Sequence, residues 1–262
     1  MHTLIWNGTS VEPPVQPDSA PSIQQAFNAY QQGTGGQPRA ELWVGETAAA
    51  WDSGKPGVTN AFVDSFWFVT QLGSLAQVGV ATQCRQSLVG GAYELLDKHT
   101  FQPNPDYYIA LLWTRLMGRR VIGVTQPGPD TSTPLVRAYA HCSSEGDEEG
   151  GSAPAGSIAV AIINADSSAT ARVDLRGLTQ LAPRQEYRLT APAAAGGGST
   201  ESQLHSRSVA LNGKTLDMAE DGSLPPLVPV VVTNATEVLV VHPLEIIFVV
   251  FEGADAASCK VL

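Results

Sequence analysis

The sequence lacks most of the signatures that identify common classes of protein. Its 262 residues contain no run of 18 apolar residues, so no transmembrane span is expected. The first stretch, MHTLIWNGTSVEPP, shows neither a basic segment nor a long apolar one, so either the protein is cytosolic or its true N-terminus is missing. The 5 histidines are scattered, and no G-x-S-x-G, P-loop or dinucleotide-binding motif is present. We therefore expect no metal ion and no cofactor.

Positive charge is scarce as well. Lys and Arg number 15 against 25 Asp and Glu, for a net charge of −10. This balance argues against nucleic acid as a partner, because phosphate binding needs clustered Lys and Arg. Part of the acidity is local, since the acidic residues between 145 and 149 lie in a Gly/Ser-rich stretch that we expect to be a solvated loop.

Cysteine is rare, and its three positions allow one disulfide and one free thiol. Cys84 lies in an apolar run typical of a strand and is expected to be a buried free thiol. Cys142 and Cys259 could join the second half of the chain to its C-terminus, which would imply a secretory or vacuolar compartment. Asn7 and Asn234 begin triplets of the glycosylation form, which are common by chance.

What the sequence does contain changes character near residue 120. In residues 1–120, helical patterns cover 24–32, 60–79 and 105–117, and short apolar runs typical of buried strands cover 41–45 and 80–88. Asn60 is a plausible N-cap, and Gly73 or Gly79 could end that helix. The alternation predicts parallel βα units. A closed barrel of such units usually needs about 250 residues, so this part is expected to be the end of a larger domain.

Residues 121–262 are typical of an all-β domain. Turn signals such as Asn212-Gly213 and Asp221-Gly222 separate eight strand-like runs, which predicts an antiparallel sandwich. The runs are Leu135–His141, Ile158–Asn164, Ala171–Leu175, Tyr187–Thr190, Ser208–Leu211, Val228–Thr233, Val238–Val241 and Ile246–Phe251. Residues 191–204 are of low complexity and are expected to form a loop.

Glu46 is the first candidate for chemistry. It follows the run Leu42-Trp43-Val44-Gly45, and active sites of parallel α/β folds lie at such strand ends. A carboxylate there can act as a nucleophile, a general base or a metal ligand. The small residues after Glu46 leave room for a substrate. The alternative is a surface glutamate that caps the next element.

A second candidate group follows the strand-like run at 80–88. Arg85 and Gln86 could project into the same opening at the strand ends as Glu46, and Tyr93 could fold back over that opening. The alternative is that Arg85 forms a structural ion pair and Tyr93 is a rim aromatic. Trp51 could line a sugar subsite, although core packing is the alternative. The other tryptophans are expected in the core: Trp6, Trp43, Trp67 and Trp113.

Three stretches resemble the heparanase-like endo-β-glucuronidases, which are retaining glycoside hydrolases of family 79, and the plant members in particular. They read WVGETAAAW, NAFVDSFWFVTQLG and CRQSLVGGAYELLDKHTFQPNPDYYIALLWTRLMGRRV. The resemblance implies a (β/α)₈ barrel with an appended β-sandwich, here the last two or so βα units in residues 1–120 and the sandwich in 121–262. It implies a glycan substrate with β-linked glucuronic acid.

The resemblance also implies roles for individual residues. Glu46 would be the nucleophile at the end of the seventh strand, Gln86 and Tyr93 would contact substrate, and Cys142 and Cys259 would form the disulfide of the sandwich. His2 aligns weakly with a histidine that lines the cleft. The family is extracellular, vacuolar or lysosomal, and in part membrane-associated, so the resemblance predicts a secreted glycoprotein.

The resemblance also has gaps. A retaining glycosidase needs a second carboxylate about 5–5.5 Å from the nucleophile. In the family this acid/base is a Glu preceded by Asn, and this chain has no Asn-Glu dipeptide. Asp52 stands where relatives have residues that accommodate a uronate, and it would repel one. We expect a fragment that is inactive without the missing N-terminal barrel portion. The alternative is a non-catalytic carbohydrate-binding or structural remnant.

Overall fold

The computed structural model describes residues 41–124, 135–144, 153–173, 183–192, 199–234 and 236–260. Several predictions from the sequence fall outside these residues. They concern the helix at 24–32, His2, Asn7, Trp6 and the acidic loop at 145–149.

The described chain starts with a parallel pair of strands. Strands β1 (Leu42–Thr47) and β2 (Val80–Arg85) pair in parallel and are connected through helix α2 (Phe62–Gln77). Helix α3 (Pro105–Leu116) follows β2. This order confirms the βα alternation predicted from the sequence. Within the described residues neither strand pairs with a third one, so each has an unpaired edge.

The start of helix α2 differs from the prediction. Its N-cap is Ala61, and Asn60 instead accepts a hydrogen bond from the amide of Gly57 at 2.8 Å. The prediction of Asn60 as the cap was wrong because its side chain closes the preceding turn. At the other end Gly79, with a φ of 84°, follows the helix in the left-handed conformation that glycine adopts readily.

Gly73 lies inside helix α2 rather than at its end. A Cβ at this position would come within 2.1 Å of the Tyr139 ring. Tyr139 belongs to strand β4 (Val136–Ser143), so glycine is needed here for the close approach of the helix to the sheet.

The rest of the described chain is mainly antiparallel sheet. The large sheet has the order β3-β4-β5-β12-β7-β8-β9, and β10 also pairs with β7. Its other strands are β3 (Met117–Ile122), β5 (Ile158–Asn164), β7 (Arg184–Thr190), β8 (Ala210–Leu211), β9 (Lys214–Thr215), β10 (Val230–Val232) and β12 (Glu245–Phe251). A second sheet pairs β6 (Ala171–Val173) with β11 (Leu239–Val241).

Each of the eight predicted strand-like runs overlaps one of these strands. Strands β3 and β9 are additions. The predicted loop at 191–204 was wrong in part, because Thr200–Leu204 forms helix α4. Its N-cap is Ser199, whose hydroxyl accepts a hydrogen bond from the amide of Ser202 at 3.2 Å. A short 3₁₀ helix, η1 (Ala257–Cys259), lies near the C-terminus.

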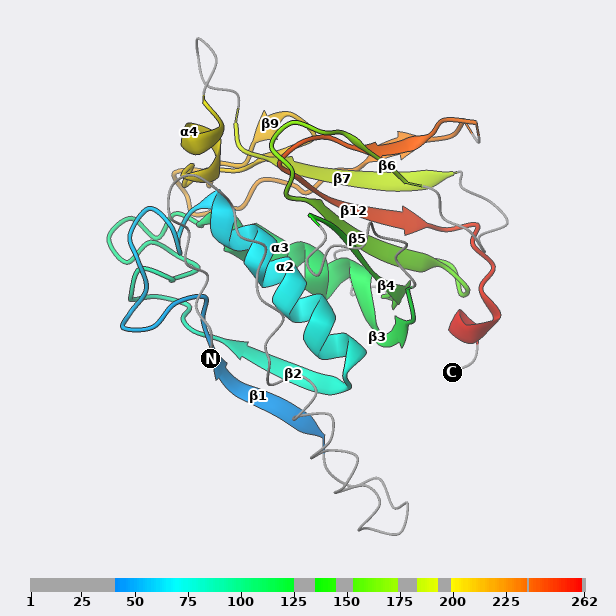
Figure 1. Ribbon diagram of the computed structural model, residues 1–262, viewed down its shortest axis with the longest axis horizontal. Coiled ribbons are helices and arrows are strands. Elements are labelled where there is room, and N and C mark those ends of the chain that lie inside the picture. The colour runs from blue at the N-terminus through cyan, green and yellow to red at the C-terminus, as the bar shows by residue number, and fades with distance from the viewer. Residues whose placement is uncertain are drawn as a thin grey trace.

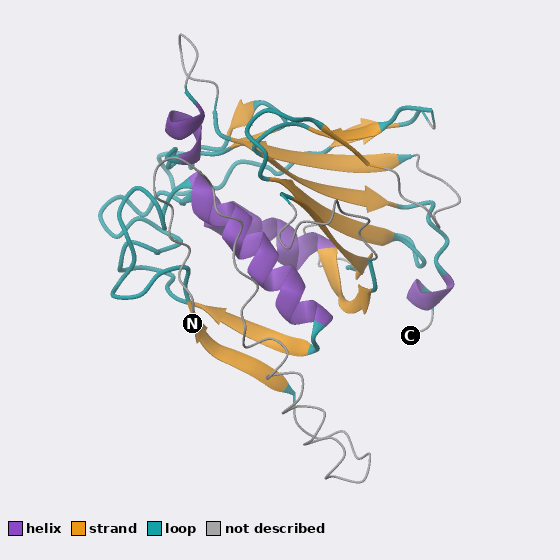
Figure 2. Cartoon of the chain, in the orientation of Figure 1, coloured by secondary structure: helices purple, strands orange, loops and turns teal. Residues whose placement is uncertain are grey.

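The central strands β5 and β12 of the large sheet are buried on both faces. Along β12, Ile246, Phe248 and Val250 pack toward helices α2 and α3, and the alternate residues Ile247, Val249 and Phe251 pack toward β6 and β11. Helix α2 therefore lies between the parallel pair and the large sheet, as Figures 1 and 2 show. The division predicted near residue 120 falls within β3, and the larger core includes residues from both sides of it.

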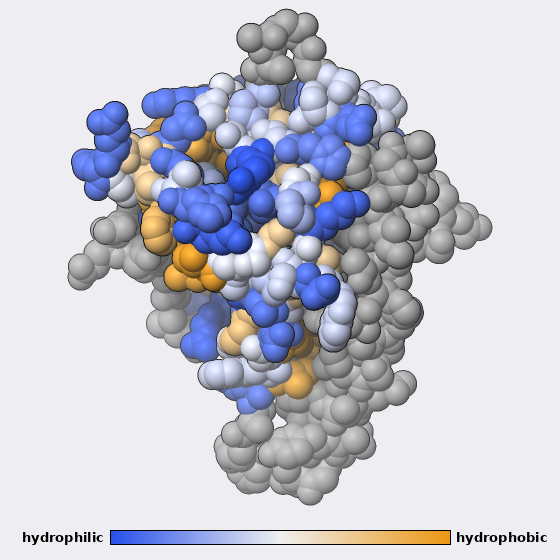
Figure 3. All heavy atoms as spheres, turned by 90° about the vertical axis from the view of Figure 1, so that its left-hand side faces the viewer, coloured by the Kyte–Doolittle hydropathy of each residue, from blue (hydrophilic) through white to orange (hydrophobic). Residues whose placement is uncertain are grey.

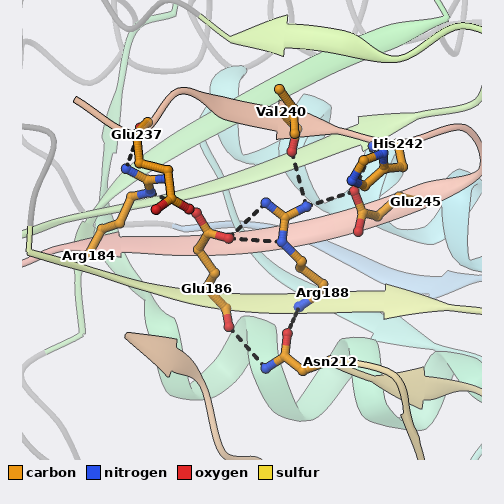
Figure 4. A network of polar contacts seen from close by, with 8 residues as sticks. All are labelled: Arg184, Glu186, Arg188, Asn212, Glu237, Val240, His242 and Glu245. Atoms are coloured by element: carbon orange, nitrogen blue, oxygen red, sulfur yellow. Dashed lines mark hydrogen bonds and ion pairs between the residues drawn. The ribbon is translucent and has the colours of Figure 1, made fainter. Parts of the chain in front are cut away.

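A network of charged side chains joins β7 to the second sheet (Figure 4). Glu186 bridges Arg184 and Arg188, with N–O distances of 2.7 and 2.8 Å. Arg188 also pairs with Glu245 at 2.9 Å and donates to the carbonyl oxygen of Val240 at 3.0 Å. Arg184, Glu186 and Glu245 are buried and Arg188 is 21% exposed, so the network links β7 to β12 and to the carbonyl of β11 beside the apolar core.

The cysteines and two tryptophans test further predictions. Cys142 and Cys259 form the disulfide implied by the resemblance. Cys84 is a free thiol but is exposed, so the prediction of burial was wrong. Trp43 is 59% exposed and not in the core, whereas Trp67 is buried. Trp43 and Cys84 are exposed because no described element covers the face of the parallel pair away from helix α2.

Candidate active site

Glu46 lies at the carboxyl end of β1, next to the last residue of the strand. That last residue, Thr47, is buried on the side of α2, where its hydroxyl accepts a hydrogen bond from Gln71 Nε2 at 3.3 Å. The register of the strand pairing shifts between Val44 and Thr47, which interrupts the regular alternation of side chains where Glu46 lies. The side chain of Glu46 is exposed to solvent.

Gln86 follows β2 and is held against the end of β1. Its backbone amide donates a hydrogen bond to the carbonyl oxygen of Thr47 at 2.8 Å. Thr47 is the register partner of Arg85, so this bond extends the strand pairing by one residue. The Gln86–Ser87 peptide bond is cis. The structure thus brings Gln86 beside the strand end that carries Glu46.

Arg85 does not reach into this mouth. Its side chain turns toward the helices, where Nη2 lies 2.9 Å from Asp64 and 2.8 Å from Asp106. The guanidinium lies over the rings of Trp67 and Phe68, with its Cζ 5.4 and 5.2 Å from their centroids, and the side chain is 6% exposed. This position is the structural ion pair that the sequence left as the alternative.

The two aspartates belong to the first turns of α2 and α3, so Arg85 ties both helices to the end of β2. Burial raises the pKa of Asp64 well above its usual range, and the charge of Asp106 raises it further, against the opposing effect of Arg85. The cluster thus sets one guanidinium against two carboxyl groups, and the raised pKa of Asp64 favours its neutral form, which reduces the charge that must be buried.

Two loops border the strand ends: the first mouth loop, residues 48–61, and the second mouth loop, residues 86–104. In the first, Asp52, Ser53 and Gly54 have φ angles of 54°, 64° and 83°, which produce a tight turn. Trp51 is 84% exposed at this turn. Both loops lie on the left of Figure 1, and Figure 3 shows that this face mixes hydrophilic side chains with smaller hydrophobic areas.

Tyr93 lies beneath the mouth loops rather than at their rim. It is 7% exposed, and its ring packs against Gly54 and Gly91. A Cβ would come within 2.9 Å of the ring at Gly54 and within 2.7 Å at Gly91. Both glycines also have positive φ angles, so the tyrosine and the two turns fit together only with glycine at these positions.

Buried polar groups hold the second mouth loop from inside. Glu94 accepts a hydrogen bond from the amide of Gly90 at 2.7 Å, and its carbonyl oxygen accepts one from Asn104 Nδ2 at 2.8 Å. The amide of Ala92 donates to the carbonyl oxygen of Ser53 at 2.6 Å and so joins the two loops. The mouth is therefore a connected structure, to which both loops contribute.

The sequence predicted Glu46, Gln86 and the loop positions as candidate site residues but missed the residues that support them. Nothing local indicated that Asp64 and Asp106 would meet Arg85, because the three residues lie on different elements. The contacts that Arg207 makes to the second mouth loop were missed for the same reason. Asn234 is exposed, and its Oδ1 accepts a hydrogen bond from Thr236 Oγ1 at 2.8 Å.

The described residues show neither a metal-binding cluster nor a membrane-spanning helix. In this part of the chain, His, Cys, Asp and Glu side chains form no group of three that could hold a metal ion. Nor do the described segments include a helix with the length and apolar character needed to cross a membrane.

Comparison with known proteins identifies relatives. A family model described as glycosyl hydrolase family 79, N-terminal domain, matches residues 12–73. The chain is 36% identical over 246 residues to heparanase-like protein 3 of Arabidopsis thaliana, covering 84% of this chain and 42% of that protein. It is also 36% identical over 220 residues to baicalin-beta-D-glucuronidase of Scutellaria baicalensis, covering 84% of this chain and 38% of that protein.

The chain thus spans less than half the length of these relatives. Among solved structures, the GH51 alpha-L-arabinofuranosidase of Thermotoga petrophila matches with a TM-score of 0.55 and 15% identity, over 88% of this chain and 46% of that one. That likeness shows a fold shared with a glycoside hydrolase. The chain belongs to glycosyl hydrolase family 79, and within it resembles the heparanase-like proteins.

Proposed function

We propose that this chain is the nucleophile-bearing part of a retaining glycoside hydrolase that cleaves β-glucuronosyl linkages in glycans. The observation that carries the proposal is the position of Glu46, an exposed carboxylate at the carboxyl end of a parallel strand. Catalytic residues of alternating β/α barrels lie at this end. The similarity to a protein named a β-D-glucuronidase supports the substrate class.

In this proposal β1 and β2 are the last two strands of a (β/α)₈ barrel within residues 1–120, and residues 121–262 form a β-sandwich. The parallel pairing of the two strands supports it, as do their unpaired edges among the described residues. The greater length of the relatives supports it as well, because it leaves room for the other barrel strands.

Glu46 would attack the anomeric carbon of the sugar and form a glycosyl-enzyme. A second carboxyl group, about 5–5.5 Å away, would protonate the leaving oxygen and then activate water. We propose that this acid/base comes from a segment outside the 262 residues, because the chain has no Asn-Glu dipeptide. The hydrolysis would then require the remaining part of the barrel.

Gln86 and Trp51 are the proposed substrate contacts of this chain. An amide side chain suits sugar hydroxyl groups, and an exposed indole offers a flat apolar face to a sugar ring. Tyr93 is buried beneath the turns, and we assign it the role of shaping them. Asp52 is exposed in the same turn as Trp51, so it would weaken the binding of a uronate carboxylate that came close.

We further propose a secretory route, ending outside the cell or in a vacuole or lysosome. The Cys142–Cys259 disulfide supports this, because disulfides persist in oxidising compartments. The exposure of Asn234 makes its glycosylation sterically feasible. Loss of mass on treatment with an N-glycosidase, abolished by Asn234→Gln, would support the assignment of that site.

The test is an assay of the chain expressed with its upstream coding sequence, using p-nitrophenyl β-D-glucuronide. We expect hydrolysis with retention of the anomeric configuration, seen by NMR. Glu46→Gln should lower kcat by about 10³-fold or more, because it removes the nucleophile. Glu41→Gln is the matched control, since Glu41 is an exposed glutamate just before the other end of β1.

Two outcomes would contradict the proposal. Unchanged turnover by Glu46→Gln would show that Glu46 is not the nucleophile. Binding of glucuronide oligosaccharides without turnover, in a protein that includes the upstream barrel, would favour the non-catalytic alternative. Comparing the glucuronide with the corresponding β-D-glucoside, in the parent protein and in Asp52→Gly, would establish the preference for a uronate.

A further inference from the structure

Residues 205–207, which connect α4 to β8, reach both the first mouth loop and the start of helix α2. We call them the clamp segment. His205 Nδ1 donates a hydrogen bond to the carbonyl oxygen of Gly57 in the first mouth loop. The carbonyl oxygen of Ser206 accepts one from the amide of Phe62 at 2.8 Å. Phe62 is the first residue of α2, whose amide has no partner within the helix, so the contact satisfies a group that the helix cannot.

Arg207 makes the corresponding contacts to the second mouth loop. Its Nη2 lies 2.8 Å from Asp97 Oδ2 and 2.8 Å from Asn104 Oδ1, and its Nε lies 3.3 Å from the same Asn104 oxygen. Asn104 is 2% exposed. Its amide oxygen is screened from water and needs a donor, which Arg207 supplies from the antiparallel half of the chain.

Asp97 links this contact to the shape of the loop. Its other oxygen, Oδ1, accepts hydrogen bonds from the amides of His99 and Thr100, at 2.9 and 2.8 Å. Arg207 and these amides hold the pKa of Asp97 far below its usual range, with Arg207 the largest cause. The carboxylate is therefore ionised at neutral pH and shared between the turn and the clamp segment.

The contact continues from Asn104 toward the active-site end of the loop. Asn104 Nδ2 donates to the carbonyl oxygen of Glu94, and the Glu94 carboxylate accepts from the amide of Gly90. The hydroxyl of Ser87, the residue after Gln86, donates to the carbonyl oxygen of Gly90. Arg207 is thereby connected, through hydrogen bonds within the loop, to the position of Gln86.

We propose that the clamp segment sets the spacing of the two mouth loops, and that Arg207 is a positioning residue for glycan binding. The proposal deepens the function proposed above and rests on it for the part that concerns the glycan. Arg207 touches no reacting atom in this proposal. It acts through Asp97 and Asn104, so its loss should weaken the fit of the sugar more than the chemistry at Glu46.

The first experiment measures loop order without any substrate. Hydrogen exchange is followed by mass spectrometry in the expressed protein, in Arg207→Ala and in Arg172→Ala. Arg172 is an exposed arginine on β6, so it controls for the loss of one positive charge from the same half of the chain. We expect exchange of residues 97–104 to accelerate about tenfold in Arg207→Ala and to stay unchanged in Arg172→Ala.

The second experiment measures kinetics with p-nitrophenyl β-D-glucuronide in the protein that includes the upstream sequence. We expect Arg207→Ala to raise KM about fivefold and to change kcat less than about twofold. Arg207→Lys keeps the positive charge but loses the paired N–H donors of the guanidinium, so its KM should lie between those of the parent protein and Arg207→Ala. A merely structural role would lower the folded fraction and hence the apparent kcat, without moving KM.

A third variant keeps the proposal falsifiable if Arg207→Ala folds poorly. Asp97→Asn keeps an oxygen for the turn but loses the charge that Arg207 meets, so it should raise KM similarly. The KM of the double variant should then rise by less than the product of the two single increases, since both substitutions remove the Arg207–Asp97 ion pair. Additive effects of the two substitutions on KM would overturn the proposal.

The outcomes separate the clamp from the proposed function. Equal exchange in Arg207→Ala and Arg172→Ala would overturn the clamp, whatever the activity. Accelerated exchange with an unchanged KM would overturn the role in glycan binding. If the parent protein hydrolyses no glucuronide, the proposed function fails, and the exchange result still decides whether Arg207 orders the loop.

Discussion

The amide nitrogen of Gln86 and the carbonyl oxygen of Thr47 lie 2.8 Å apart and join the ends of the two parallel strands. Glu46 directly precedes Thr47, so this hydrogen bond holds the exposed carboxylate beside the start of the second mouth loop. Directly behind the bond, Arg85 ties the same strand end to Asp64 and Asp106 on the two helices. The geometry of the candidate site therefore depends on the Arg85–Asp64–Asp106 cluster, which is buried behind the site and does not line it.

Replacing Arg85 by Met should destabilise the fold. The substitution removes the guanidinium partner of two buried carboxyl groups, and breaking a buried pair in this way costs about 3 kcal/mol of unfolding free energy. Urea denaturation followed by circular dichroism measures the loss. The matched control is Arg119→Met, because Arg119 is 95% exposed and lies 3.9 Å from Glu41, so its loss should cost less than about 0.5 kcal/mol.

The double variant Arg85→Met/Asp106→Asn completes that comparison. Replacing the Asp106 carboxyl group, which has then lost its guanidinium partner, should recover part of the lost stability. If Arg85→Met costs no more than Arg119→Met, the cluster does not hold the helices to β2.

Asp64→Asn should change how stability depends on pH. An unfolded Asp has a pKa of about 3.9, and the folded pKa of Asp64 is raised by burial and by Asp106. A raised folded pKa gives stability that is complete below the unfolded value and is lost as pH rises through the folded value. The unfolding free energy of the parent protein, relative to that of Asp64→Asn, should therefore fall as pH rises from 4 upward.

Urea titrations at several pH values measure this difference. Glu220→Gln, a change at an exposed acidic residue, should run parallel to the parent protein over the same range. A parallel curve for Asp64→Asn would mean that Asp64 is ionised in the folded state.

Gly73→Ala should lower stability although alanine favours helices. The added Cβ would lie 2.1 Å from the Tyr139 ring, so the helix or the ring must move. Overpacking of this kind costs typically more than the propensity gain, and we expect a net loss of about 2 kcal/mol. Thermal unfolding measures it, with Gly45→Ala as the control because nothing lies within 4 Å of a Cβ there. Relief of the loss by Tyr139→Leu would confirm the contact, whereas an unchanged melting temperature would contradict it.

The three cysteines should differ in reactivity. The exposed thiol of Cys84 should react with a maleimide in the native protein, and the other two should react only after reduction. The disulfide closes a separation of 117 residues, so Cys142→Ser/Cys259→Ser should cost about 4 kcal/mol of unfolding free energy. Cys84→Ser should be nearly neutral. Mass spectrometry counts the labelled thiols, and more than one before reduction would contradict the assignment.

The local elements were largely predictable. The 3.6-residue pattern indicated α2 and α3, and Pro105 begins α3 as predicted. Strand patterns indicated β1, β2 and the antiparallel runs. These predictions hold because the spacing of apolar residues along the chain decides which face of a helix or strand can be buried. The side chain of Asn60 shows the limit, because its partner, the amide of Gly57, lay in a turn that the sequence did not reveal.

By itself the sequence determined the order of the main elements, the position of Glu46 at a strand end and, through resemblance, the family. Only the tertiary structure decided where Arg85 points, that Cys84 and Trp43 are exposed, and that Arg207 holds the second mouth loop. The physical reason is that local patterns report which residues are buried, whereas a charge or a donor finds its partner across the fold. Arg207 and Asp97 are 110 residues apart in the sequence, and only the folded structure brings Arg207 Nη2 to 2.8 Å from Asp97 Oδ2.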